Sequence, residues 1–151
     1  EAGDRLLSYT GDNTGEHISS KNMYFSELTG LYWVWKNVKD VTYVGTCHYR
    51  RYLINNLGYA LSETEIRHLL SKYDLITTKT LQLNFSYEYG FAQNHKPYYL
   101  EKTYEAICRV CPEYKDTYQE LVQGCHTYFG NILITSKKLY ISSANKSTFP
   151  L

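Results

Sequence analysis

Two arginines and a histidine lie close together in the sequence, at His48, Arg50 and Arg51. Guanidinium groups offer planar, forked donors that suit the oxygens of a diphosphate, and they stay charged at physiological pH. Imidazole titrates near neutrality, so His48 could serve as a base, an acid or a hydrogen-bond donor. The residue types favour an anion-binding site; the alternative is two surface cations beside a histidine that ends a strand.

A carboxylate that could partner these arginines is Glu27. It lies near one edge of the apolar arc of a helix expected over residues 23–38. A buried carboxylate is costly unless it is paired. We expect an ion pair between Glu27 and Arg50 or Arg51; the alternative is that Glu27 turns outward to solvent.

Two further motifs carry weaker signals. The segment Gly11-Asp12-Asn13-Thr14-Gly15 can present backbone N–H groups and short side chains to a sugar or a phosphate, although a plain turn is the simpler interpretation. Cys108 and Cys111 have CxxC spacing, but Pro112 follows at once and Cys108 falls on an apolar helical stripe. We therefore expect reduced thiols and no metal on the cysteines.

Hydrophobic periodicity divides the chain into alternating helices and strands. It predicts a helix over 23–38 with Asn22 as N-cap, a buried strand over 41–47, and a helix beginning at the capping box Ser62–Glu65. The expected elements that follow are a strand over 74–78, a long loop over 79–98, helices over 99–110 and 113–123, and a strand over 128–134.

This alternation predicts an α/β fold with a largely parallel sheet. Ligands of such sheets bind beyond the carboxyl ends of the strands, and His48 directly follows the expected strand over 41–47. The chemistry of His48, Arg50 and Arg51 and the expected fold therefore indicate the same site.

The composition agrees with one folded domain. The chain has 151 residues, of which 43% are hydrophobic and 21% charged, as in globular proteins. A net charge of +1 argues against a nucleic-acid partner. No apolar run approaches the roughly 20 residues of a membrane span. The 17 tyrosines suit either an ordinary core or a cleft for polar ligands such as sugars.

Several blocks of sequence together resemble one family. They are Asp12-Asn13-Thr14-Gly15, Ile18-Ser19, Lys21-Asn22, the ELTGLYWVWKN segment from Glu27 to Asn37, and GTCHYRRY from Gly45 to Tyr52. In this order and spacing they are similar to the DUF4422 family of bacterial glycosyltransferases. The resemblance covers about residues 9–139 and includes 72–76, His95, 112–114 and Asn131.

The resemblance implies a single domain over 1–151 with a GT-A-like, Rossmann-like sandwich that binds a nucleotide sugar. Relative to the family we expect truncation at both ends. No family-type first strand precedes Tyr9, and residues 141–151 match nothing in the family pattern.

The implied function is that of a hexosyltransferase. It would move a sugar, galactofuranose in related enzymes, from a nucleotide-sugar donor to a glycan or lipid-linked acceptor in capsule, exopolysaccharide or lipopolysaccharide synthesis. We expect a UDP-sugar donor, a cytoplasmic location at the inner face of the membrane with peripheral contact to it, and no nucleic-acid partner. The alternative is a non-catalytic remnant or a carbohydrate-binding protein.

The resemblance also implies site residues. The catalytic candidates are His48, Glu27 and His95, in that order. Candidates for donor or substrate binding are Asp12, Asn13, Ser19, Lys21, Asn22, Thr29, Tyr32, Lys36, Tyr49, Arg50, Arg51 and Asn131. GT-A enzymes often hold a divalent ion with a DxD motif, but the comparable place here carries His48–Arg51. We therefore expect the arginines to neutralise the diphosphate, with no cofactor; Mn²⁺ or Mg²⁺ is the alternative.

Overall fold

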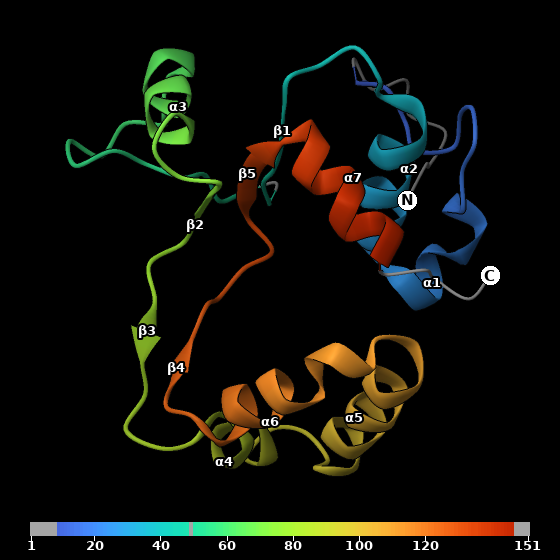
Figure 1. The fold of residues 1–151 in the computed structure, drawn as a ribbon, viewed down its shortest axis with the longest axis vertical. Coiled ribbons are helices and arrows are strands. Elements are labelled where there is room, and N and C mark those ends of the chain that lie inside the picture. Colours follow the sequence, from blue (N-terminus) through green and yellow to red (C-terminus); the bar gives the residue numbers. More distant parts are fainter. Residues whose placement is uncertain (1–8, 49, 147–151) are drawn as a thin grey trace.

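The computed structural model describes residues 9–48 and 50–146. A three-stranded sheet with helices is joined through a short two-stranded ribbon to a helical lobe (Figure 1). The elements in chain order are η1 (Ser19–Lys21), α1 (Asn22–Phe25), α2 (Leu28–Asn37), β1 (Tyr43–Thr46), α3 (Glu63–Leu70), β2 (Leu75–Thr77), β3 (Leu81–Gln82), α4 (Tyr87–Ala92), α5 (Tyr98–Val110), η2 (Pro112–Tyr114), α6 (Lys115–Gln123), β4 (His126–Thr127), β5 (Leu133–Ser136) and α7 (Lys137–Lys146).

The sheet has β5 at its centre, antiparallel to β1 on one side and to β2 on the other. All pairings between the described strands are antiparallel, so the prediction of a largely parallel sheet is wrong for them. β1 and β2 do run in the same direction. They are not neighbours, because the chain returns from the helical lobe and inserts β5 between them.

Helices cover both faces of this sheet, which confirms the α/β class. Successive side chains of a strand point to opposite faces. Leu133 and Thr135 line a cavity with residues of α2 and α7, whereas Ile134 lines another with Ile66 of α3. Figure 1 accordingly shows α7 and α2 on one side of the strands and α3 on the other.

Two side chains of α7 fasten it to backbone carbonyls of α2. Lys137 Nζ donates to the Val34 carbonyl at 2.8 Å, and the Tyr140 hydroxyl donates to the Leu31 carbonyl at 2.7 Å. Burial lowers the pKa of Lys137 and raises the pKa of Tyr140 to about 12, because desolvation disfavours the charged form of each group.

The helix predicted over 23–38 is two helices, α1 and α2, because the backbone turns at Ser26. Its φ of 47° lies in the left-handed region, which is uncommon for a residue other than glycine. Asn22 is not the N-cap that the pattern predicted but the first residue of α1. Its side-chain amide donates to the Ser26 carbonyl at 3.0 Å and so stabilises the break.

The remaining predictions of secondary structure differ in accuracy. The capping box begins α3 as predicted, β1 and β2 lie within the strands predicted over 41–47 and 74–78, and α5 and α6 match the predicted helices. The last strand is displaced from 128–134 to Leu133–Ser136, and the loop predicted over 79–98 contains β3 and α4. Residues 137–146 form α7, so part of the segment expected to match nothing is helical.

The helical lobe consists of α4, α5, η2 and α6, and the β3–β4 ribbon leads into it and out of it (Figure 1). Inside the lobe the Tyr118 hydroxyl donates to the Leu100 carbonyl at 3.0 Å, and the Tyr118 ring stacks on Tyr104. Val122 of α6 is buried. The lobe therefore has its own small core of aromatic and aliphatic side chains.

Candidate functional site

The predicted cations are displayed directly after β1. The backbone N–H of Arg51 donates to the His48 carbonyl at 3.0 Å, so that the two residues form an isolated antiparallel bridge. His48, Arg50 and Arg51 are all exposed. Tyr49, the fourth candidate of this cluster, lies outside the described residues. The local turn thus presents one imidazole and two guanidinium groups at the carboxyl end of β1.

One hydroxyl adds to the strand pairing between the end of β1 and the start of β5. Thr46 Oγ1 donates to the Asn131 carbonyl at 3.2 Å and accepts from the Leu133 N–H at 3.3 Å. Asn131, which was predicted to bind substrate, is exposed, and its backbone carbonyl accepts this hydrogen bond from the end of β1.

We call His48, Arg50 and Arg51 the cationic cluster. After it the chain folds back on itself over residues 52–61. Leu61 N–H donates to the Leu53 carbonyl at 3.0 Å, and the tip turns at Gly58, whose φ of 84° favours glycine. Asn55 Oδ1 accepts from the backbone N–H groups of Leu57 and Tyr59 at 3.0 and 3.1 Å. An asparagine at this position therefore stabilises the turn with its own side chain.

The same asparagine joins this turn to α3. Asn55 Nδ2 donates to Glu65 Oε1 at 2.9 Å, while Glu65 Oε2 accepts from the Ser62 backbone N–H at 2.8 Å. The Ser62 hydroxyl and N–H, followed by Asn55, lower the pKa of Glu65 to about 2, because each donates to the charged carboxylate. Glu65 is thus an anion at every physiological pH.

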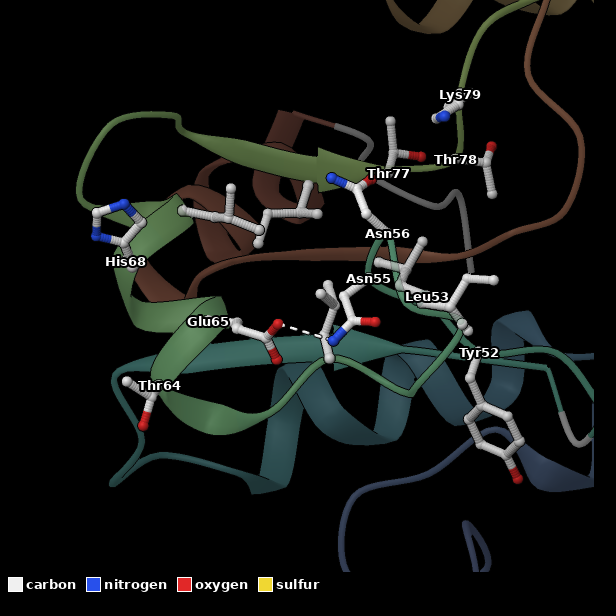
Figure 2. A pocket seen from close by; sticks show the side chains of 15 residues that line it. Tyr52, Leu53, Asn55, Asn56, Thr64, Glu65, His68, Thr77, Thr78 and Lys79 are labelled. Carbon is white, nitrogen blue, oxygen red and sulfur yellow. Dashed lines mark hydrogen bonds between the residues drawn. The ribbon is translucent and has the colours of Figure 1, made fainter.

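The turn, α3 and the end of β2 enclose a large open cavity of about 1060 Å³. Figure 2 shows side chains from all three segments around one hollow, among them Asn55 from the turn, His68 from α3 and Lys79 beyond β2. The Thr77 hydroxyl donates to the Ile132 carbonyl at 2.9 Å, which fixes the end of β2. Tyr52, which directly follows Arg51, also lines the cavity.

The cavity is large enough for a small-molecule ligand, for which about 300–1,000 Å³ is usual. A smaller cavity of about 130 Å³ shares Tyr52 and Leu53 with it and is lined by Cys47, the residue before His48. The residues on either side of the cationic cluster therefore line cavities: Cys47 lines the small one, and Tyr52 lines both the small and the large one. Apolar side chains line much of the hollow, together with hydroxyls, amides and the Glu65 carboxylate, and Lys79 adds a cation.

A second group of predicted residues forms a hydrogen-bonded cluster on α2. Thr29 Oγ1 donates to Asp12 Oδ2 at 2.6 Å and accepts from Asn22 Nδ2 at 3.2 Å. Thr29 is only 1% exposed, so a ligand cannot reach it directly. The structure brings Asp12, Asn22 and Thr29, three of the predicted binding residues, together, and it gives Thr29 the role of positioning Asp12.

Tyr32 and Lys36 meet on Glu16 one turn further along α2. The Tyr32 hydroxyl donates to Glu16 Oε1 at 2.9 Å, and Lys36 Nζ lies 3.1 Å from the same oxygen. Both contacts lower the pKa of Glu16, Lys36 more than Tyr32. Burial, with the hydrogen bond to Glu16, raises the pKa of Tyr32. Tyr32 is only 5% exposed, so it supports the loop over residues 12–16 and does not face solvent.

Two residues that the site prediction missed complete this fastening. Trp33 Nε1 donates to the Thr14 carbonyl at 2.7 Å, and Asn37 Nδ2 donates to the Glu16 carbonyl at 2.8 Å. Both belong to the ELTGLYWVWKN block. Their hydrogen-bonding side chains, one helical turn apart, were the sequence signal that could have identified them. The block therefore holds residues 12–16 against α2.

The other predicted residues are dispersed. Glu27 is exposed and has no ion pair among the described residues, so the expected pairing with Arg50 or Arg51 is not found. His95 lies in the helical lobe, with its ring 4.7 Å from that of Phe91. Asn13 is exposed, Lys21 ends η1, and Ser19 Oγ is 2.8 Å from His17 Nδ1.

Within residues 9–48 and 50–146 no three side chains of the kind that bind metals gather in one place. The four cysteines are free thiols. The described helices include none with the length and apolar character needed to cross a bilayer.

A family model described as a domain of unknown function (DUF4422) matches residues 1–145. Because this match spans nearly the whole chain, the protein belongs to the DUF4422 family. A solved apo structure of WbbM, a bifunctional glycosyltransferase, has a similar fold, with a TM-score of 0.75 and 23% sequence identity. The similarity covers 89% of this chain and 29% of the WbbM chain. No curated protein matches the chain.

Proposed function

We propose that this chain is a glycosyltransferase domain that binds a nucleotide-sugar donor beside the carboxyl end of β1. The observation that carries the proposal is that His48, Arg50 and Arg51 are exposed after β1 and directly precede Tyr52, which lines a cavity of about 1060 Å³. The fold shared with a bifunctional glycosyltransferase over 89% of the chain supports it.

The arginines have a defined role in this proposal. Sugar transfer releases a nucleoside diphosphate, whose growing negative charge requires cations or hydrogen-bond donors. Arg50 and Arg51 would supply forked donors to the diphosphate, and Lys79 would add a third cation from beyond β2. This arrangement needs no bound metal; a divalent ion carried in by the donor is the alternative that the experiment below separates.

Among the three catalytic candidates, His48 is the nearest in sequence to Tyr52, which lines the cavity, so we assign it the role of base or of donor contact. Glu27 at the start of α2 and His95 in the lobe come from other elements and stay secondary candidates. Asp12, with Asn13 beside it, would present polar groups from the loop that α2 holds in place.

The substrate assignment follows the family resemblance. We propose a UDP-sugar donor, with galactofuranose as one candidate hexosyl group, and a glycan or lipid-linked acceptor in the synthesis of bacterial surface polysaccharide. Such a reaction takes place in the cytoplasm, where nucleotide sugars are made, and a lipid-linked acceptor would bring the domain to the inner membrane face.

The proposal is tested by thermal denaturation with UDP, GDP or CMP, each with and without Mn²⁺. A ligand at about 100 times its dissociation constant stabilises the fold by about 2.7 kcal/mol, which raises the midpoint measurably. We expect a shift with UDP that does not need Mn²⁺. No shift with any nucleotide would contradict the proposal, and a shift only with Mn²⁺ would contradict the role given to the arginines.

A further inference from the structure

A separate cavity, of about 420 Å³, lies in the helical lobe, which Figure 1 shows apart from the sheet and the end of β1. Aromatic rings from four segments surround it. Its lining includes Tyr87 and Phe91 of α4, Tyr99 of α5, Tyr118 of α6 and Tyr128 after β4. The lobe thus concentrates several of the chain's tyrosines around one hollow.

Three tyrosine hydroxyls at this cavity are available to a ligand. Those of Tyr87, Tyr99 and Tyr128 have no hydrogen-bond partner within the part of the chain that the structure describes, whereas Tyr118 donates to the Leu100 carbonyl. A phenolic hydroxyl both donates and accepts hydrogen bonds. Tyr99 and Tyr128 are 54% and 55% exposed, so solvent and ligands can reach them.

The lining also indicates the charge of the ligand. Besides the rings it consists of Leu100, Thr103, Leu121, Val122 and Thr127, so none of its side chains is charged. A phosphate or carboxylate bound here would lose water without gaining an opposite charge, which is costly. The cavity therefore favours a neutral ligand, in contrast to the cationic end of β1.

We propose that this lobe cavity binds a neutral sugar unit of the acceptor glycan. A pyranose ring combines apolar C–H faces, which suit aromatic rings, with hydroxyls that pair with tyrosine and threonine hydroxyls. The assignment of this sugar to the acceptor rests on the proposed function, in which the cationic cluster binds the diphosphate of the donor. In this proposal the charged donor binds at the large cavity and the neutral acceptor sugar binds at the lobe cavity.

The test is saturation-transfer NMR on the whole chain with the methyl glycosides of glucose, galactose and mannose as neutral probes. Galacturonic acid serves as a charged probe with the same ring as galactose. We expect transfer to at least one neutral glycoside and none to galacturonic acid. Absence of transfer to all three glycosides, or equal transfer to galacturonic acid, would overturn the proposal.

Adjacent residues provide matched variants. Tyr128 and Phe129 are both 55% exposed, but only Tyr128 lines the cavity. Tyr128→Ala is expected to weaken glycoside binding about tenfold, and Phe129→Ala to leave it unchanged. Should Tyr128→Ala not fold, Tyr99→Ala against Tyr98→Ala offers the same comparison, since these residues are 54% and 53% exposed. Equal effects within a pair would overturn the assignment.

UDP binding measured on the same samples separates this inference from the proposed function. UDP binding without glycoside binding would overturn the lobe site and leave the donor site standing. Glycoside binding that depends on Tyr128, without UDP binding, would support a sugar site in the lobe and contradict the transferase proposal.

Discussion

The side-chain amide of Asn55 donates to one carboxylate oxygen of Glu65 at 2.9 Å, while the other oxygen accepts from Ser62 at the start of α3. One carboxylate therefore joins the turn that follows the cationic cluster to the helix that forms a wall of the large cavity. This link is local in sequence, yet it shapes the candidate donor site.

The Asn55–Glu65 link predicts a dependence of stability on acid pH. A lowered carboxyl pKa stabilises the fold above the unfolded-state value of about 4.5, and this contribution is lost as the pH falls toward the folded-state pKa of about 2. Urea unfolding between pH 5 and 2 should show a smaller loss of stability in Glu65→Gln than in the parent chain. Identical pH profiles would contradict the assigned role of Glu65.

The Thr29–Asp12 hydrogen bond predicts that removing one buried hydroxyl is costly. Thr29→Val keeps the shape of the side chain but leaves the Asp12 carboxylate without its 2.6 Å donor. We expect a loss of about 1–3 kcal/mol in the free energy of unfolding, measured by urea denaturation. Thr117→Val, at an exposed position of α6, is the control and should change stability little. A loss no larger than that of the control would contradict the positioning role.

The link between α2 and α7 predicts an alkaline effect. The raised pKa of Tyr140 gives a stabilisation that is complete below the unfolded-state value of 10.0 and is lost as the pH rises toward about 12. Tyr140→Phe should lower stability at pH 7 by about 1 kcal/mol and should reduce the further loss above pH 10. Tyr98→Phe, an exposed tyrosine in the lobe, is the control; a Tyr140→Phe variant that behaves like it would contradict the link.

The large cavity predicts a selective role for Lys79. This residue lines the cavity, whereas Lys72, exposed just after α3, does not. Lys79→Ala should weaken UDP binding several-fold in calorimetric titration, and Lys72→Ala should not, because only the first removes a cation facing the ligand. Equal affinities in the two variants would place the diphosphate elsewhere.

Local signals predicted much of the fold. The capping box placed the start of α3, and the apolar runs placed β1 and β2, because these features depend on neighbours in sequence. The order of the strands could not be predicted from these local signals, since the chain passes through the whole lobe before β5 pairs with β1 and β2. The break at Ser26 was missed because it depends on side-chain contacts of Asn22 and Thr29 with the Ser26 carbonyl.

The candidate site was predicted in part for the same reason. His48, Arg50 and Arg51 are contiguous with a strand end, so their joint display followed from the sequence. Asn55 and Lys79 were missed, because their neighbourhood arises only when the turn, α3 and β2 come together. Thr29 and Tyr32 were expected to bind substrate, but burial makes them supports of residues 12–16.

The central claim, a diphosphate held by the arginines after β1, is tested most directly by calorimetric titration with UDP, UMP and uridine. We expect affinity to fall in that order, and Arg51→Ala to weaken UDP binding about 10- to 100-fold while changing uridine binding little. Arg109→Ala, an exposed arginine at the end of α5, should bind UDP like the parent chain. Equal affinities for UDP and uridine, or an Arg51→Ala variant with unchanged UDP affinity, would contradict the account.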